Sequence, residues 1–508
     1  MNGLRRALIL ATLVSLAGVD GSARQAAAPS PVSPRPPGPA AERAQFLTRF
    51  ARGYFPGRTG QILIVPREGT ILTRPEASVP YMHGSPWAYD RRIPMLFWGA
   101  GVTPGKYALP ALQQDVAVTI ASALGISMPR TATGKVLPGI RPATPRPRAV
   151  FLLVLDGMRP DYFDRHAGVM PTLMGLRKDA AWFSNAEVNY LPTNTGAGHA
   201  SIATGSEPRV HGITGNNFFD RATRQRHDML DDWNPRDLVA LTLSDVWQMH
   251  TGRRGRVIAQ GSSLPASVAL AGHGACQAAG FPVVHAAYDE TAGVWKSDPE
   301  CFTLPHQLDG FDSRQIFPRD GMWMGHRVDT VSEIRRSALF STFEADTFVR
   351  LIETQGVGDD DVPDLLLLNY KTADYVGHKH GPDSPELAAA LGELDRNLAR
   401  ILKAIEARVG REYLMAITGD HGMPTNPPPG GGRYFAPDVV ASIHAKFDPG
   451  GQLIPYYEPE NAQIFVDEER LAGLGLSLKD VVSFLEAQPF VFAAFTEDEV
   501  RREAVRLR

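Results

Sequence analysis

Short, continuous apolar runs recur along the chain, with helical patterns between them. The runs are "QILIV" from Gln61, "PMLFW" from Pro94, "AVFLLVL" from Ala149, "DLLLLN" from Asp364, "YLMAIT" from Tyr413 and "QIFV" from Gln463. Strands that are apolar at nearly every position are buried on both faces, as happens when helices cover both sides of a mostly parallel sheet. The sequence therefore predicts an α/β fold in three layers with a central, mostly parallel sheet.

The segment from Ser384 to Gly410 is the clearest helix. Ser384 can cap it, Pro385 suits its first turn, and Gly410 can end it. Apolar residues recur in it at helical spacing, namely Leu387, Leu391, Leu394, Leu398, Ile401, Leu402 and Ile405. Residues 218–335 are less periodic and rich in turns. We expect them to form an insertion, a cap region that covers one edge of the sheet.

The N-terminus has the layout of a secretory signal peptide, assigned to residues 1–25. Arg5 and Arg6 precede an apolar run from Ala7 to Ala17 that is too short to cross a bilayer. Residues 26–44 are rich in Pro and Ala and are interpreted as a linker. These features predict a periplasmic or secreted protein without a membrane span.

Net charge and cysteine content narrow the possible partners and compartment. The net charge of −3 gives no sign of a general basic surface, so no specific nucleic-acid partner is expected. The chain has two cysteines, Cys276 and Cys301. In an oxidising compartment we expect them to form a disulfide, and two free buried thiols are the alternative.

Three of the apolar runs are followed by side chains that bind metals. Asp156 follows the run from Ala149, Asp420 and His421 follow the run from Tyr413, and Asp374 and His378 follow the run from Asp364. The carboxyl ends of strands are where an open α/β sheet places its site. Each motif alone has a structural explanation, since Asp-Gly is a common turn and a single loop histidine is often structural. Together the three motifs favour a metal site.

The stretch "LPTNTGAGHASIATGSEPRVHGITGNN", from Leu191 to Asn217, contains a short predicted helix from Gly196 to Thr204. Gly205 can end this helix, and Thr195 falls at or just before its first turn. The exposed N–H groups and the dipole of a helix N-terminus favour an anion there. The Thr195 hydroxyl is therefore either a nucleophile or an ordinary N-cap.

These motifs resemble the alkaline phosphatase superfamily, and most closely its bacterial branch with a threonine nucleophile, near the type I phosphodiesterases and nucleotide pyrophosphatases. The resemblance rests on Asp156 and on the blocks "TNTGAGH…TGSEPRVHGITGNN", "TADYVGHKHGP" and "GDHG", and it extends over most of the chain after the predicted signal peptide. It implies an alkaline-phosphatase-like fold, a hydrolase acting on small-molecule phosphate esters, and two Zn²⁺ ions.

The resemblance also implies roles for individual residues. Asp156, Asp420 and His421 would hold one zinc ion, and Asp374, His378 and one further histidine would hold the other. Thr195 would be the nucleophile and bridge both ions, and Asn216 would donate a hydrogen bond to a phosphoryl oxygen. Mixed histidine and carboxylate ligands favour zinc over magnesium.

The missing histidine is His83, which lies at an unexpected place in the chain. In the family this ligand stands near the C-terminus, in a stretch that resembles "YMHGSPWAYDRRIPMLFWGAGVTPG" from Tyr81. The sequence therefore predicts a circular permutation, in which residues 45–145 correspond to the family's C-terminal segment and residues 146–508 form the main catalytic region. His83 could instead be an ordinary turn histidine, and His444 lacks the family's surrounding motif.

One departure from the family bears on the substrate. The monoesterases of this branch carry a Lys-x-Arg pair that binds the phosphate oxygens, and Pro265, Ala266 and Ser267 stand in the matching place. A dianionic monoester needs such cations, so their loss favours phosphodiesters and nucleotide pyrophosphates. Lys371 is the candidate replacement cation and is otherwise a solvated loop lysine.

Four other functions are consistent with, or excluded by, particular features of the sequence. An alkaline phosphatase acting on monoesters and an inactive phosphate-ester-binding protein remain alternatives. A sulfatase would need a Cys-x-Pro-x-Arg type motif, which neither cysteine has. A phosphoglycerate mutase is normally cytosolic, which disagrees with the predicted signal peptide.

Overall fold

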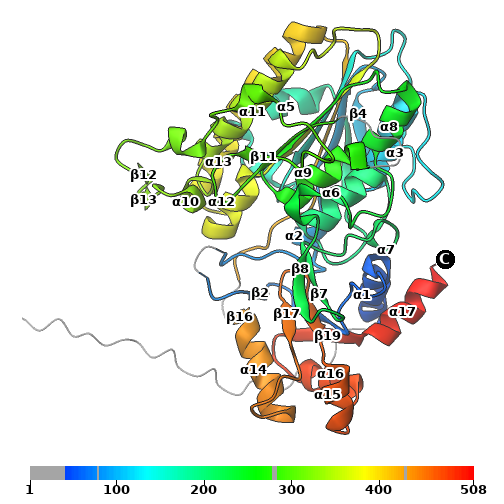
Figure 1. Cartoon of the computed structure of the whole chain (residues 1–508), viewed down its shortest axis with the longest axis vertical. Helices are drawn as coiled ribbons and strands as arrows, with labels where there is room; N and C mark the ends of the chain where they lie inside the picture. The colour runs from blue at the N-terminus through cyan, green and yellow to red at the C-terminus, as the bar shows by residue number, and fades with distance from the viewer. Residues whose placement is uncertain (1–39, 77–78, 277–282, 428–431, 508) are drawn as a thin grey trace, which may run out of the picture.

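The computed structural model describes residues 40–76, 79–276, 283–427 and 432–507. They form two lobes, a larger one built on a nine-stranded sheet and a smaller one on a four-stranded sheet (Figure 1). The predicted signal peptide and most of the predicted linker lie outside the described residues. The end of the linker assignment, residues 26–44, is wrong, because the first helix already begins at Ala40. In the described residues, no helix is long and apolar enough to cross a membrane.

The nine-stranded sheet carries the order β11-β10-β9-β14-β5-β15-β3-β6-β4. In that order the strands are Trp295–Lys296, Val284–Tyr288, Val257–Gly261, Asp364–Tyr370, Ala149–Leu155, Tyr413–Thr418, Met95–Gly99, Ala181–Glu187 and Gly105–Leu112. Every strand runs parallel to β5 except β3 and β11. All residues of β5, β14 and β15 are buried, which explains their continuous apolar sequences.

Helices cover both faces of this sheet and complete the predicted three layers. One face packs against α3 (Asp115–Ala123), α6 (Thr195–Thr204), α8 (Leu243–Thr251) and α9 (Leu264–Ala271). The other packs against α5 (Pro171–Lys178), α11 (Leu339–Thr354), α12 (Thr372–His380) and α13 (Pro385–Val409). Successive residues of β5 alternate between these two cores, as the pleat of a strand requires. The Ser384 hydroxyl accepts a hydrogen bond from the Leu387 N–H, as expected for the cap of α13.

The smaller lobe contains two of the predicted apolar strands, the runs from Gln61 and from Gln463. Nothing in the sequence indicates that these two strands belong to a different sheet from the others. The sheet of this lobe has the order β17-β18-β1-β19, with strands Tyr456–Glu458, Gln463–Phe465, Ile62–Pro66 and Val491–Thr496. One face packs against α14 (Ala436–Phe447), α15 (Glu468–Gly473) and α16 (Leu478–Glu486). The other packs against α1 (Ala40–Gly53) and α17 (Glu497–Arg506). An apolar run indicates that a strand is buried but not which strands it pairs with.

The predicted insertion extends one edge of the main sheet, because residues 218–335 supply β9, β10 and β11. Cys276 and Cys301 are joined by a disulfide within it, as expected. Three small two-stranded sheets complete the strands: β2 (Ile71–Thr73) with β16 (Arg433–Phe435), β7 (Asn217–Asp220) with β8 (Gln225–Asp228), and β12 (Met322–Trp323) with β13 (His326–Arg327). The short helices are α2 (Ala88–Arg91), α4 (Tyr162–Arg165), α7 (Pro208–His211) and α10 (Val331–Ile334), with 3-10 turns at Ala167–Val169, Asp231–Trp233, Gly274–Cys276, His306–Leu308 and Ser313–Ile316.

Candidate active site

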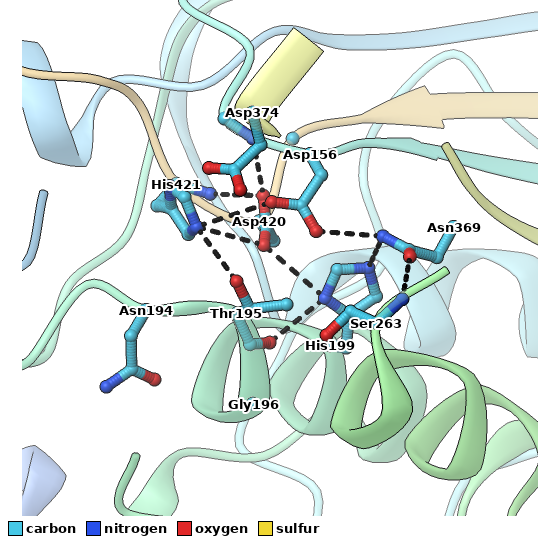
Figure 2. A network of polar contacts seen from close by, with 12 residues as sticks. Asp156, Asn194, Thr195, Gly196, His199, Ser263, Asn369, Asp374, Asp420 and His421 are labelled. Carbon is cyan, nitrogen blue, oxygen red and sulfur yellow. Dashed lines mark hydrogen bonds and ion pairs between the residues drawn. The ribbon is translucent and has the colours of Figure 1, made fainter. Parts of the chain in front are cut away.

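The three metal-binding motifs meet at one edge of the main sheet. Strands β14, β5 and β15 are neighbours and parallel, so the residues that follow them come together. Strand β3 is antiparallel to β15, with Met95 opposite Thr418, so the loop before β3 reaches the same edge. That loop carries His83. Figure 2 shows Asp156, Asp420, His421 and Asp374 converging above the first turn of α6.

Asp156, Asp420 and His421 form the first candidate ligand group. One ligand atom of each lies within 4.8 Å of the others, and all three side chains are buried. His421 Nε2 lies 3.5 Å from Asp156 Oδ1 and 3.2 Å from Asp420 Oδ2. Its Nδ1 lies 2.7 Å from the Gly422 carbonyl oxygen. Donation from Nδ1 leaves Nε2 free for a metal, the usual arrangement of a histidine ligand.

His83, His378 and Asp374 are the residues predicted for the second ion, whereas the cluster whose ligand atoms all lie within 4.8 Å of one another is His83, Asp374 and His421. Asp374 Oδ1 lies 3.8 Å from His83 Nε2 and 3.4 Å from His378 Nε2. Each histidine again places Nδ1 against a backbone carbonyl, at 2.8 Å from Thr193 O for His83 and 2.6 Å from Tyr81 O for His378. The structure thus brings His83 into the site from the N-terminal part of the chain.

The two groups are contiguous, and His444 belongs to neither. The rings of His83 and His421 stack with their centres 3.6 Å apart. His444 lies in α14 of the smaller lobe, where its Nε2 accepts a hydrogen bond of 3.0 Å from the Ile454 N–H.

The side chains of both groups fit divalent cations. Asp374 Oδ1 and Asp420 Oδ2 are buried and have no hydrogen-bond partner in the part of the chain that the structure describes. Burial also lowers the pKa of His83 well below its ordinary value, which favours the neutral imidazole that binds metals. Unpaired buried carboxylate oxygens are costly unless a cation faces them. Carboxylate oxygens together with three imidazole nitrogens form the kind of ligand set that zinc prefers.

Thr195 is the first residue of α6, and its hydroxyl does not cap the helix. The cap is Asn194, whose side chain accepts a 3.1 Å hydrogen bond from the Ala197 N–H. The helix thus starts one residue earlier than predicted, while Gly205 ends it with a positive φ of 67°, as expected. Thr195 Oγ1 lies 3.3 Å from His421 Nε2, so the hydroxyl faces the ligand groups (Figure 2).

Two neighbouring hydroxyls that could have replaced Thr195 are engaged elsewhere. The Thr193 hydroxyl donates to the Ser85 carbonyl oxygen at 3.1 Å. Ser201 Oγ lies 3.0 Å from His211 Nε2. Among the three, Thr195 has its hydroxyl beside the candidate ligands.

Lys371 is buried among the ligands, so its interpretation as a solvated loop lysine is wrong. It directly follows β14 and is 6% exposed. Its Nζ lies 2.8 Å from Asp156 Oδ1, 2.6 Å from Asp374 Oδ2 and 2.9 Å from Thr195 Oγ1. Burial alone would lower the pKa of Lys371, but the surrounding carboxylates raise it above its ordinary value. The ammonium therefore places a permanent positive charge between the two ligand groups and the hydroxyl.

Asn216 lies beside the first turn of α6, where it has an unforeseen partner. Its Oδ1 accepts a 2.7 Å hydrogen bond from the Gly196 N–H, and its Nδ2 donates to Glu460 Oε1 at 2.6 Å. Burial, together with the nearby Glu458, raises the pKa of Glu460 to about 7. Glu460 stands in a loop of the smaller lobe, far from any recognised motif.

His199 and Asn369 are two further site residues that the sequence analysis missed. His199 Nδ1 lies 3.0 Å from the Thr195 carbonyl oxygen, one helical turn away. Asn369 Nδ2 lies 2.9 Å from Asp156 Oδ2 and 3.0 Å from His199 Nε2, so it links β5 to α6 (Figure 2). Spacing could have identified both, because His199 shares a helix face with Thr195 and Asn369 is the next-to-last residue of β14.

No cation replaces the missing Lys-x-Arg pair at its expected place. Pro265 lies in the first turn of α9, and Ala266 and Ser267 are buried. The segment preceding them contacts the site through the backbone, since the Ser263 N–H donates to Asn369 Oδ1 at 3.3 Å.

A mostly parallel three-layer sandwich with a threonine hydroxyl facing two carboxylate and histidine groups defines a phosphoric-ester hydrolase of the alkaline phosphatase superfamily. Residues 150–465 match the family model of type I phosphodiesterase / nucleotide pyrophosphatase. The match spans more than half of the chain, and the protein belongs to this family.

Curated relatives and solved structures agree with this assignment. The chain is 26% identical over 426 residues to alkaline phosphatase PafA of Elizabethkingia meningoseptica, which covers 72% of this chain and 78% of PafA. It is 26% identical over 337 residues to alkaline phosphatase PhoV of Synechococcus elongatus, covering 57% of this chain and 61% of PhoV. The crystal structure of wild-type PafA matches with a TM-score of 0.57 at 24% identity, over 71% of this chain and 83% of that one, and so supports the fold.

Proposed function

We propose that this protein hydrolyses phosphodiesters or nucleotide pyrophosphates with Thr195 as nucleophile. The observation that carries the proposal is the position of the Thr195 hydroxyl, 3.3 Å from His421 Nε2 and 2.9 Å from Lys371 Nζ, at the start of α6. Asp156, Asp420 and His421 would hold one Zn²⁺, and Asp374, His378 and His83 the other. When bound, such ions would lower the pKa of the threonine hydroxyl and stabilise the attacking and leaving oxygens.

Residues of the chain itself bind the phosphoryl group and carry out the attack. The positive end of the α6 dipole favours the anionic phosphoryl group, and the Lys371 ammonium adds a fixed positive charge beside the hydroxyl. Asn216 Nδ2 carries two N–H groups, of which Glu460 accepts one, and we expect the other to donate to a phosphoryl oxygen. Thr195 Oγ1 loses its proton and attacks phosphorus, and the P–O bond to the leaving group breaks. The leaving group, an alcohol from a diester or a phosphate from a pyrophosphate, departs with a proton. Water then hydrolyses the phosphothreonine ester, which restores the threonine hydroxyl and releases the phosphate monoester.

Two features favour diesters over monoesters. The Lys-x-Arg pair is absent at Pro265–Ser267, so the cations that hold a dianion in the monoesterases are missing there. Glu460 adds a carboxyl group on the Asn216 side of the site. Above its raised pKa of about 7 this carboxyl carries a negative charge, which disfavours a dianionic monoester more than a monoanionic diester.

A monoester-specific alkaline phosphatase is the second candidate, and Lys371 is the observation that favours it. Its ammonium lies 2.9 Å from the proposed nucleophile and could replace a missing cation. Rates on a nitrophenyl monoester and a matching nitrophenyl diester decide between the two. We expect the larger kcat/KM on the diester, and a clear preference for the monoester would assign the phosphate-binding role to Lys371.

An inactive phosphate-ester-binding protein is the third candidate, and Thr195→Ala tests it together with the nucleophile. We expect this variant to keep its bound zinc and to lose more than about a thousandfold in rate. Equal, near-zero rates in the wild type and the variant would support the binding protein. Nearly normal turnover in the variant would move the nucleophile to another hydroxyl.

We also infer that the protein works in the periplasm or outside the cell. The Cys276–Cys301 disulfide supports an oxidising compartment, and the signal-like N-terminus of the sequence points the same way. Fractionation of cells that express the full chain tests this, since a cytosolic, unprocessed protein would contradict it.

A further inference from the structure

A second cluster of metal-binding side chains lies at the far end of α12, outside the active site. His326 comes from β13, His380 ends α12, and Glu386 lies in the first turn of α13. One ligand atom of each lies within 4.8 Å of the others. Figure 1 shows β12, β13, α10 and α12 gathered at one side of the larger lobe. The cluster therefore joins the β12–β13 hairpin to the junction between α12 and α13.

The contacts within the cluster leave the Nε2 atom of His380 available to a ligand. His326 Nε2 lies 2.8 Å from Glu386 Oε1, and the rings of His326 and His380 have their centres 4.6 Å apart. His380 Nε2 is buried and has no hydrogen-bond partner among the described residues. A buried ring nitrogen without a partner is costly, and a bound cation would satisfy it.

The charges around the cluster also suit a cation. Glu386 supplies a carboxylate to the cluster, and its Oε1 contacts His326 Nε2 at 2.8 Å. His380 ends α12, where the negative end of the helix dipole attracts a cation. Lys379, the neighbouring residue on α12, pairs with Glu333.

We propose that His326, His380 and Glu386 bind a zinc ion that is separate from those of the proposed active site. Two imidazole nitrogens and one carboxylate oxygen are a common protein ligand set for zinc, and water can take the fourth position because the side chains are partly exposed. The ion ties the β12–β13 hairpin to the end of α12.

This second site supports the first through α12. Helix α12 also carries Asp374 and His378 of the proposed active site. His380 lies on a different face of this helix from His378, because residues two apart do not share a helix face. The proposal does not depend on the reaction proposed for the active site, since it rests only on the three side chains and their surroundings.

Zinc stoichiometry of the whole protein tests the proposal. The wild type, His326→Gln/His380→Gln and the control His306→Gln, an exposed histidine elsewhere, are equilibrated with buffered Zn²⁺ and analysed for bound metal. We expect the double variant to bind one equivalent less than the wild type and the control. Equal zinc content in all three, across the range of free Zn²⁺, would overturn the proposal.

Fluorescence gives a second measurement that does not need the double variant to fold. The Trp323 ring lies 6.1 Å from the His380 ring. Titration of the wild type with Co²⁺ should quench a component of tryptophan emission that Trp323→Phe lacks and that a chelator restores. Identical quenching in the wild type and Trp323→Phe would show that no ion binds beside this ring.

Discussion

Lys371 introduces one positive charge among buried carboxylates at the centre of the site. Its Nζ contacts Asp156, Asp374 and the Thr195 hydroxyl at distances of 2.6–2.9 Å. Without a bound cation this ammonium is the nearest compensating charge for both carboxylates. With two divalent cations present, it is one positive charge among several. Its contribution to stability should therefore depend on the metal.

Lys371→Met tests this dependence. Removing one partner of a buried ion pair costs about 3–5 kcal/mol when the other is left uncompensated. We expect the variant to lose about that much unfolding free energy in a chelator and clearly less in saturating Zn²⁺. Urea unfolding under both conditions measures the difference. Equal losses in both would mean that Lys371 stabilises the fold independently of the metal.

His83 and His444 provide a matched pair of histidine variants. His83 Nε2 lies 3.8 Å from Asp374 Oδ1. His444 lies in the smaller lobe, where its Nε2 accepts a hydrogen bond from the backbone N–H of Ile454. We expect His83→Gln to reduce active-site zinc from two equivalents toward one and to abolish most hydrolysis, while His444→Gln changes neither. The proposed site at His326 adds the same equivalent to both variants, so the comparison remains valid. Full zinc content in His83→Gln would exclude His83 as a ligand.

Motif residues at strand ends could be predicted from the sequence, and their supporting residues could not. Asp156, Asp374 and His421 follow apolar strands, and the topology of a parallel sheet brings such residues together. Glu460 belongs to a loop of another lobe, and nothing local marks its contact with Asn216. Lys371 was recognised, but its side-chain direction depends on packing around β14 that a single sequence does not reveal.

At the scale of elements, short polar links hold the extended edge of the sheet in place. His273 follows α9, and its Nδ1 lies 2.8 Å from Asp245 Oδ2 in the first turn of α8. Its Nε2 lies 2.8 Å from the Leu238 carbonyl oxygen. Burial lowers the pKa of His273, but the contact with Asp245 outweighs it and raises the pKa above its ordinary value.

This link predicts a specific pH dependence. A histidine whose pKa is higher in the folded state stabilises the fold below its unfolded pKa of about 6.5, and this stabilisation is lost as pH rises through the folded value. We expect His273→Gln to be less stable than the wild type below about pH 6.5. The difference should shrink at alkaline pH. Urea midpoints of both proteins over this range measure it, and a pH-independent difference would contradict the prediction.

The disulfide provides the second prediction at this scale. Cys276 and Cys301 have a sequence separation of 25, and the loop that their disulfide closes contains β10 and β11. Cys276→Ser/Cys301→Ser should lose about 3 kcal/mol of unfolding free energy, since the open chain has more unfolded conformations. Reduction of the wild type should cost a similar amount. Thiol titration of the denatured, unreduced wild type should find no free thiol, and two free thiols would exclude the bridge.

The elements themselves were predicted more reliably than their arrangement. The apolar run and capping residues of α13 specify a helix locally, and its bounds in the structure agree with those signals. The assignment of β1 and β18 to a second sheet depends on pairing between segments hundreds of residues apart. Such pairing leaves no mark on an individual strand, which is why the smaller lobe was not foreseen.

At the scale of the whole molecule, the N-terminal segment is embedded in later parts of the chain. Strand β1 pairs with both β18 and β19, and β3 pairs with β15. Helices α1 and α17 pack side by side, with a 3.0 Å hydrogen bond from Thr48 to Glu503. We infer a circular permutation of the family order. The match to the family model begins at residue 150, after the segment that carries His83.

A chain reconnected in the family order tests the permutation. It would run from Arg148 to Leu507, then through a flexible linker of about 12 residues into Ala40–Ile140. The linker must connect the end of α17 to the start of α1. Because these helices pack side by side, the gap is comparable to the length of α1, roughly 21 Å, and a linker of this size can span about 40 Å. We expect a folded protein with unchanged zinc content and a rate within about threefold of the wild type. Failure to fold would show that the present order is required.

The position of β1 also has a consequence for synthesis on the ribosome. This strand and the following loop with His83 emerge early, but the neighbours of β1 in the sheet, residues 463–465 and 491–496, emerge among the last. Until β18 and β19 are present to pair with β1, the loop that carries His83 has no fixed position beside the other site residues. An incomplete chain should therefore remain inert, and hydrolysis can begin only when the final strand has been added.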